Sequence, residues 1–246
     1  DLKSNEAALK YFLLGSFSSA LLLYGIALTY GLTTTTDLAA IAAQAHAGGA
    51  GPVLLLGMTL MAAAFCFKIA AAPFHMWAPD VYEGAPTSVT AFMSVGPKAA
   101  GFAVIGRVFL TAFPSLQADW TAILIGVAIL SMAAGNILAL AQTNIKRMLA
   151  YSSIAHAGYM LLGIIAGTQK GLSAVLTYLL IYAFMNMGAF AVVILLDKGE
   201  EIKDYEGLAR SHPLAAAAML VFMFSLTGIP PTAGFIGKFT IFLAAV

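Results

Sequence analysis

The sequence predicts an all-α protein, a polytopic transmembrane helix bundle. Of the 246 residues, 61% are hydrophobic and only 9% are charged, whereas a soluble domain carries about 25% charged residues. A chain this poor in charge is suited to lipid, where every backbone polar group must be paired inside the protein. Its long apolar stretches are rich in Ala, Leu, Gly and Met, which favours helices over the alternating strands of an outer-membrane barrel.

Seven apolar runs approach or exceed the length of about 20 residues that a spanning helix needs. We therefore expect residues 1–246 to form a single membrane domain with about seven transmembrane helices. The sequence starts at Asp1 without a methionine and stops inside an apolar run, so we expect both ends to be truncated. The runs are 11–32, 52–74, 86–110, 120–142, 148–168, 172–196 and 213–246.

Basic residues favour one side of this predicted bundle. When the connections are assigned alternately to the two sides, Lys170 and Arg107 fall on one side, and the other side receives most of the remaining lysines and arginines. Cytoplasmic loops are enriched in Lys and Arg, so we expect that second side to be cytoplasmic. Its basic residues are Lys3, Lys10, Lys146, Arg147, Lys198, Lys203 and Arg210.

Three basic residues remain, Lys68, Lys98 and Lys238, and all three fall inside apolar runs. Lys98 lies near the middle of 86–110, about 18 Å from either end at 1.5 Å per residue, which is beyond comfortable snorkelling reach. All acidic residues lie in predicted loops or at helix ends, so no deep carboxylate is available as a partner. A charged lysine at mid-membrane costs ~3 kcal/mol, and low dielectric favours the neutral amine. We therefore predict that these buried lysines carry protons.

Two of the runs place a lysine beside a helix breaker. Pro73 follows Lys68, and Pro230 and Pro231 precede Lys238. Proline removes a backbone donor and clashes with the preceding turn, so we expect two broken helices. The freed carbonyls need a partner in lipid, which a lysine amine or a trapped water can supply. Interrupted spans in matching halves of a transporter indicate its ion site.

Two histidines and several small polar residues are further candidates for a proton path. His75 lies beside the first break, and His156 lies inside a predicted span; each could be a relay residue or a packed structural one. Hydroxyl and amide side chains, together with water, would join the amines. The candidates are Thr87, Ser88, Thr90, Ser94, Ser152, Ser153, Asn186, Ser225 and Thr227.

Several other classes of function are excluded by the sequence. It contains neither a glycine-rich nucleotide loop nor a metal-ligand cluster, and Cys66 is its only cysteine. We therefore expect no flavin, nucleotide or iron–sulfur centre in this chain. A net charge of +1 gives no reason to expect a nucleic-acid partner.

Three motifs, in order along essentially the whole chain, resemble one family. They are FKIAAAPFHMWAPDVYEGAPT at 67–87, QTNIKRMLAYSSIAHAGY at 142–159 and GIPPTAGFIGK at 228–238. They are similar to segments of the antiporter-like, proton-translocating subunits of bacterial NADH:quinone oxidoreductase, respiratory complex I. The resemblance implies helices 6 to 12 of a subunit with about fourteen, built from two inverted repeats.

The resemblance also implies roles, partners and a location. Lys68 would be the helix 7 lysine, whose partner glutamate lies on helix 5, upstream of Asp1. Lys98 would be the central relay lysine, and Lys238 the lysine on the exit side. The chain would be a subunit of a translocase in the bacterial inner membrane, beside other membrane-arm subunits. NADH, flavin, iron–sulfur clusters and quinone would belong to other subunits of the complex, and quinone reduction elsewhere would shift the protons on the lysines.

Two alternatives stay open at this point. One is a sodium/proton antiporter subunit of the same superfamily, which predicts sodium-dependent transport without NADH oxidation. The other is a structural spacer of the membrane arm that transports nothing. The spacer predicts fully charged lysines bound to carbonyls, with no water path near them.

Overall fold

In the computed structural model, which describes residues 2–48 and 51–246, all regular elements are helices apart from one isolated β-bridge. The all-α prediction is therefore confirmed. Within the described residues the helices are α1 (Leu2–Thr33), α2 (Leu38–Gly48), α3 (Pro52–Lys68), α4 (Trp77–Gly84), α5 (Thr87–Ala112), α6 (Gln117–Leu140), α7 (Ile145–Ile165), α8 (Gln169–Leu196), α9 (Leu208–Ser211), α10 (Pro213–Thr227) and α11 (Ala233–Ala245), with 3₁₀ turns at Pro114–Leu116 and Ile202–Tyr205.

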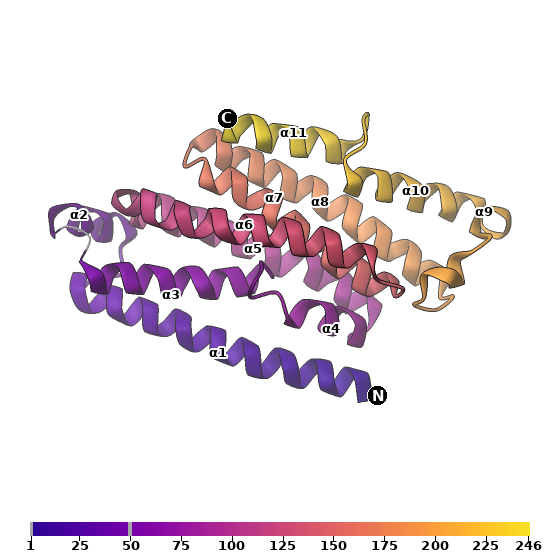
Figure 1. Cartoon of the computed structure of the whole chain (residues 1–246), viewed down its shortest axis with the longest axis horizontal. Helices are drawn as coiled ribbons and strands as arrows, with labels where there is room; N and C mark the ends of the chain where they lie inside the picture. The colour runs from indigo at the N-terminus through magenta and orange to yellow at the C-terminus, as the bar shows by residue number, and fades with distance from the viewer. Residues whose placement is uncertain (1, 49–50) are drawn as a thin grey trace.

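The long helices lie side by side along the longest axis of the molecule (Figure 1). Helices α1 and α3 form one edge, α10 and α11 form the opposite edge, and α5 to α8 fill the space between them. Large side chains such as Trp120, Tyr178, Tyr182 and Phe102 are fully buried in this central layer. Lys98 on α5 and His156 on α7 belong to the same central layer.

Five helical segments in the described chain are long and apolar enough to cross a membrane: α1, α5, Pro114–Leu140, α7 and α8. The other two predicted runs are divided. Run 52–74 holds only the 17-residue α3, which ends at Lys68, and run 213–246 is shared by α10 and α11. Proline explains both interruptions, since it cannot continue a helix ladder.

One helix lies where the sequence predicted only a polar connection. Helix α2 falls within 33–50, where its alanine-rich sequence favours a helix. Asp37 supplies the start signal, because its Oδ1 accepts a hydrogen bond of 2.8 Å from Ala40 N.

Small residues allow α6 and α7 to approach closely. A Cβ added to Gly135 on α6 would lie 2.5 Å from Ala155 N and 2.8 Å from Tyr151 O, both on the backbone of α7. These distances are too short for any side chain, so the contact requires glycine.

We predict that Gly135→Ala weakens the packing of α6 on α7. Since the clash is with backbone, the two helices must separate, at a cost of about 1–3 kcal/mol. The measurement is the midpoint of detergent-induced unfolding of the purified full-length subunit. Gly126→Ala is the matched control on the same helix, because a Cβ there meets nothing within 4 Å. Equal midpoints for the two variants would contradict the prediction.

Candidate functional site

Lys98 is buried in the centre of the helix layer, with a side chain 2% exposed. Its Nζ donates to the carbonyl oxygen of Ser153 at 2.6 Å and to Ser153 Oγ at 2.5 Å. The ring of Tyr182 lies 5.8 Å from the amine. No carboxylate pairs with this lysine in the described part of the chain, so all its partners are neutral.

Buried polar groups line α5 on the turns that precede Lys98. Ser94 and Thr90 are fully buried one and two turns earlier, respectively. Asn186 on α8 donates from Nδ2 to Ser94 Oγ at 2.6 Å. Among the described residues, Asn186 Oδ1 and Tyr182 Oη are buried without a hydrogen-bond partner. An unpaired buried acceptor is costly, so water would be accommodated favourably beside Lys98.

Lys238 on α11 contacts the end of the preceding helix. Helix α10 ends at Gly228, whose φ of 86° suits a glycine. Lys238 Nζ donates to the carbonyls of Leu226 at 2.8 Å and Thr227 at 2.9 Å, which helix geometry has freed. The ring of Tyr159 lies 4.7 Å from the same amine. As for Lys98, these partners are neutral.

His156 packs against one aromatic residue near Lys98 and another near Lys238. Its side chain is 3% exposed, and its Nδ1 is 2.6 Å from Tyr178 Oη. The ring centroids of Tyr182 and Tyr159 are 5.2 and 5.9 Å from that of His156. Since Tyr182 faces Lys98 and Tyr159 faces Lys238, a continuous group of four rings joins the two amines.

Lys68 corrects one expectation, because its side chain is exposed on the surface of this chain and not buried. Its neighbours Phe67 and Ile69 are buried, so the core at the end of α3 is filled by their side chains and not by that of Lys68. The freed backbone groups of this break bind other side chains: Trp77 Nε1 donates to Phe67 O, and Ala72 N donates to Ser131 Oγ.

The remaining sequence candidates are less closely connected. His75 is half-buried, and its Nδ1 has no hydrogen-bond partner in the described chain. Ser88 and Thr227 are exposed, whereas Ser225 is buried and caps α11 by accepting from Gly234 N. The structure therefore gathers Ser94, Ser153 and Asn186 near Lys98, whereas Ser152 and Thr227 line a cavity with His156 and Lys238.

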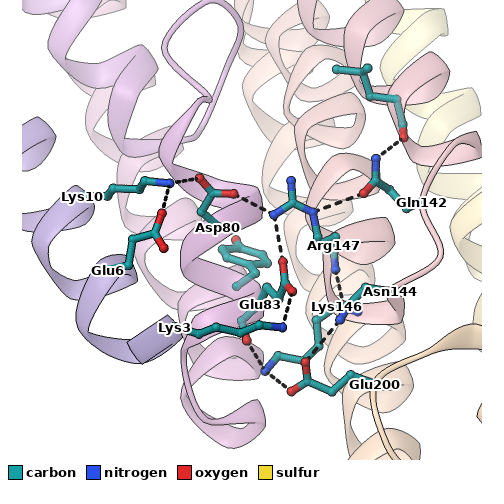
Figure 2. Close-up of polar contacts among 12 residues, drawn as sticks. Lys3, Glu6, Lys10, Asp80, Glu83, Gln142, Asn144, Lys146, Arg147 and Glu200 are labelled. Carbon is teal, nitrogen blue, oxygen red and sulfur yellow. Dashed lines mark hydrogen bonds and ion pairs between the residues drawn. The ribbon is translucent and has the colours of Figure 1, made fainter. Parts of the chain in front are cut away.

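An ion-pair cluster lies at one end of the bundle, where the sequence predicted only basic markers of orientation (Figure 2). Arg147 is its centre, and its Nη1 donates to Asp80 Oδ1 at 2.7 Å and to Glu83 Oε2 at 2.9 Å. Lys10 and Lys3 from α1 pair with the same two acids at 2.7 and 3.0 Å. The cluster consists of Lys3, Glu6, Lys10, Asp80, Glu83, Lys146, Arg147 and Glu200.

Lys146 is the buried member of the ion-pair cluster. Asn144 caps α7 by accepting from Lys146 N and Arg147 N, which fixes the backbone from which the two side chains extend. Lys146 Nζ then donates to the carbonyls of Glu83 and Ala85 and pairs with Glu200 at 2.8 Å. Sequence reasoning missed this role, because the acidic partners are 54 or more residues away.

The charges of the cluster favour ionised acids. Burial raises the pKa of Asp80 and of Glu83, but hydrogen bonds from Lys10, Lys3 and Arg147 outweigh it, and both pKa values lie below the ordinary carboxyl range. Their contribution to stability is therefore complete above about pH 4 and is lost as the pH falls below it. At neutral pH the cluster ties α1, α4 and α7 together.

We predict that Arg147→Gln loosens this end of the bundle. Two partly buried carboxylates would lose their shared partner, which costs about 1–2 kcal/mol, between the values for exposed and buried pairs. The check is the unfolding midpoint of the purified subunit at neutral pH. Arg210→Gln is the matched control, because Arg210 is exposed and outside the cluster. An unchanged midpoint for Arg147→Gln would refute the assigned role.

Together, the helices that can span a bilayer and the amines held inside them define a multi-pass membrane protein with ionisable groups in its interior. The chain belongs to the family described as NADH:quinone oxidoreductase/Mrp antiporter, TM, whose model matches residues 1–246. The predicted resemblance to the antiporter-like subunits is thereby confirmed.

Individual relatives agree with this family. The chain is 61% identical to NADH-quinone oxidoreductase subunit N of Trichlorobacter lovleyi and 57% identical to subunit N 1 of Thermodesulfovibrio yellowstonii, with 100% of the chain covered in both cases. It covers 52% and 53% of these proteins, so it spans about half the length of the curated relatives it matches. The PDVYEG motif at 79–84 and Lys238 likewise resemble subunit N.

Solved structures show the same fold. A chain of respiratory complex I from Thermus thermophilus with bound Aureothin has a TM-score of 0.84 and 43% identity, over 100% of this chain and 53% of that one. A chain of the Mrp complex from Dietzia sp. has a TM-score of 0.89 and 27% identity, over 98% of this chain and 45% of that one. The fold is thus shared by both branches that the family description names.

Proposed function

We propose that this chain is the central part of a proton-translocating subunit of NADH:quinone oxidoreductase in the bacterial inner membrane. The subunit acts beside other membrane-arm subunits, and the sites for NADH, flavin, iron–sulfur clusters and quinone lie in other subunits of the complex. Its partners are those subunits, the lipid bilayer and protons. The similarity to subunit N relatives over the full chain supports this assignment.

The observation that carries the proposal is the environment of Lys98. Lys98 is 2% exposed, and among the described residues its amine donates hydrogen bonds only to Ser153. A carboxylate at this distance would hold the ammonium form permanently, whereas a carbonyl and a hydroxyl accept from either form. A small change in nearby charge can therefore move the proton on or off Lys98.

We propose that the proton leaves Lys98 toward Lys238. The four rings of Tyr182, His156, Tyr178 and Tyr159 lie between the two amines, and the imidazole of His156 is the one ring among them with a nitrogen that can accept and return a proton. A cavity of about 370 Å³ lined by His156, Tyr159 and Lys238 gives water access to the second amine. Lys238 is then the exit-side residue.

Lys68 would set the charge that Lys98 responds to. The Lys68 side chain begins beside Gly101, one turn along α5 from Lys98. Its exposed amine has no hydrogen-bond or ion-pair partner among the described residues. We propose that a glutamate on a neighbouring helix outside this chain covers it, and that His75 has a supporting role at the same break.

The two interruptions would be corresponding features of inverted repeats. We propose that α10 and α11 are halves of one broken crossing, and that α3 with the segment after it is the other. Each pair combines a proline, freed carbonyls and a lysine, the combination from which transporters build ion sites.

We predict that Lys98→Met abolishes proton pumping while the complex still assembles. Met preserves the length of the side chain and removes its proton-binding nitrogen. The measurement is protons moved per NADH oxidised in inverted membrane vesicles containing the full complex. Lys170→Met is the matched control, because Lys170 is an exposed lysine at a helix start.

The outcomes separate the candidate functions. Unchanged pumping in Lys98→Met would favour the structural spacer and refute the relay. If Lys98→Met removed a sodium-dependent flux from a complex that oxidises no NADH, the sodium/proton antiporter would be favoured. The similarity to a chain of the Mrp complex also points to this alternative.

A further inference from the structure

Tyr159 is the one aromatic residue within reach of the Lys238 amine in the described structure, and it was not among the sequence candidates. Its ring centroid lies 4.7 Å from Lys238 Nζ, inside the range of a cation–π contact. Its hydroxyl accepts a hydrogen bond of 3.1 Å from Asn136 Nδ2 on α6, and this amide also donates to Met132 O. Helix α6 thus fixes the direction of the ring.

The Tyr159 ring differs from the other partners of Lys238 in how strongly its attraction depends on the charge of the amine. The carbonyls of Leu226 and Thr227 accept a hydrogen bond from an ammonium or from a neutral amine. The attraction of a ring face depends mainly on the positive charge and is much weaker for a neutral amine. Of the three partners, Tyr159 is therefore the one whose attraction falls most when the proton leaves.

The titratable groups that face Lys238 are few in the described chain. His156 and Tyr159 come from α7, and Tyr178 comes from α8, where it packs against Gly237. The facing residues of α10 contribute carbonyls and no ionisable side chain. Among these ionisable side chains, Tyr159 is the one whose ring face lies against the Lys238 amine and favours its charged form.

We propose that Tyr159 is a positioning residue of the Lys238 site, which holds the ammonium form over its ring at the side of the cavity. Asn136 keeps the ring in place. This inference rests on the proposed function, because it assigns a role within the exit-side step. It predicts that the ring face matters and that the hydroxyl matters little.

The test compares variants of Tyr159 in the full complex, with protons per NADH measured in vesicles from acid to alkaline pH. Without the ring the ammonium form of Lys238 is less favoured, so we expect Tyr159→Leu to shift the pH of half-maximal pumping downward by about one unit, or about 1.4 kcal/mol. Tyr159→Phe keeps the ring face and should stay within about 0.3 unit of the wild type.

A substitution of similar shape guards against a folding defect. Pentafluorophenylalanine at position 159, introduced by suppression, fills nearly the same space as Phe but reverses the charge of the ring face. It should reproduce the shift of Tyr159→Leu. A wild-type profile for this variant would overturn the inference, as would equal shifts for Phe and Leu, since these would assign the effect to the hydroxyl.

Lys238→Met, measured in the same vesicles, separates the two levels of the proposal. Normal pumping by Lys238→Met would sink the proposed function itself. If Lys238→Met lost pumping while Tyr159→Leu and the pentafluorophenylalanine variant kept the wild-type pH profile, only the role of Tyr159 would be refuted. NADH oxidation in vesicles made leaky to protons checks that each complex is assembled.

Discussion

A buried amine with only neutral partners is the constraint on which the rest of the structure depends. Lys98 is 2% exposed, and within the described chain its hydrogen bonds go to Ser153. Lipid leaves such a group no other source of stabilisation. Helix α5 must therefore stay against α7 so that Ser153 remains in reach, and α8 must supply Tyr182 and Asn186 to complete the enclosure. The close packing of the central helices follows from this need.

The molecule separates two kinds of charge. At one end, Arg147, Lys146 and their partners form the ion-pair cluster, in which acids and bases neutralise each other (Figure 2). Inside the bundle, Lys98 and Lys238 have carbonyl, hydroxyl and ring partners. Pairing fixes a charge in place, which suits a clamp between α1, α4 and α7. Neutral partners leave a proton exchangeable, which suits a path through the membrane.

Much of the fold followed from local signals, and the rest from contacts that no local signal records. Long apolar runs gave the spans, and Pro73, Pro230 and Pro231 gave the interruptions. The isolated position of Lys98 among apolar residues indicated its burial. Lys68 looked the same in sequence but is exposed, because burial depends on which face of α3 meets its neighbours. Lys146 looked like a surface marker but is buried, because its partners Glu200 and Glu83 are far away in the chain.

The protonation state of Lys98 inside the working complex tests the central claim most directly. Nitrogen NMR of the complex with ¹⁵N-labelled lysine distinguishes an ammonium from a neutral amine, and Lys98→Met identifies the signal. We expect that signal to change between the two forms as NADH is supplied and withdrawn. A signal that stays that of an ammonium in both conditions, from neutral to alkaline pH, would contradict the account.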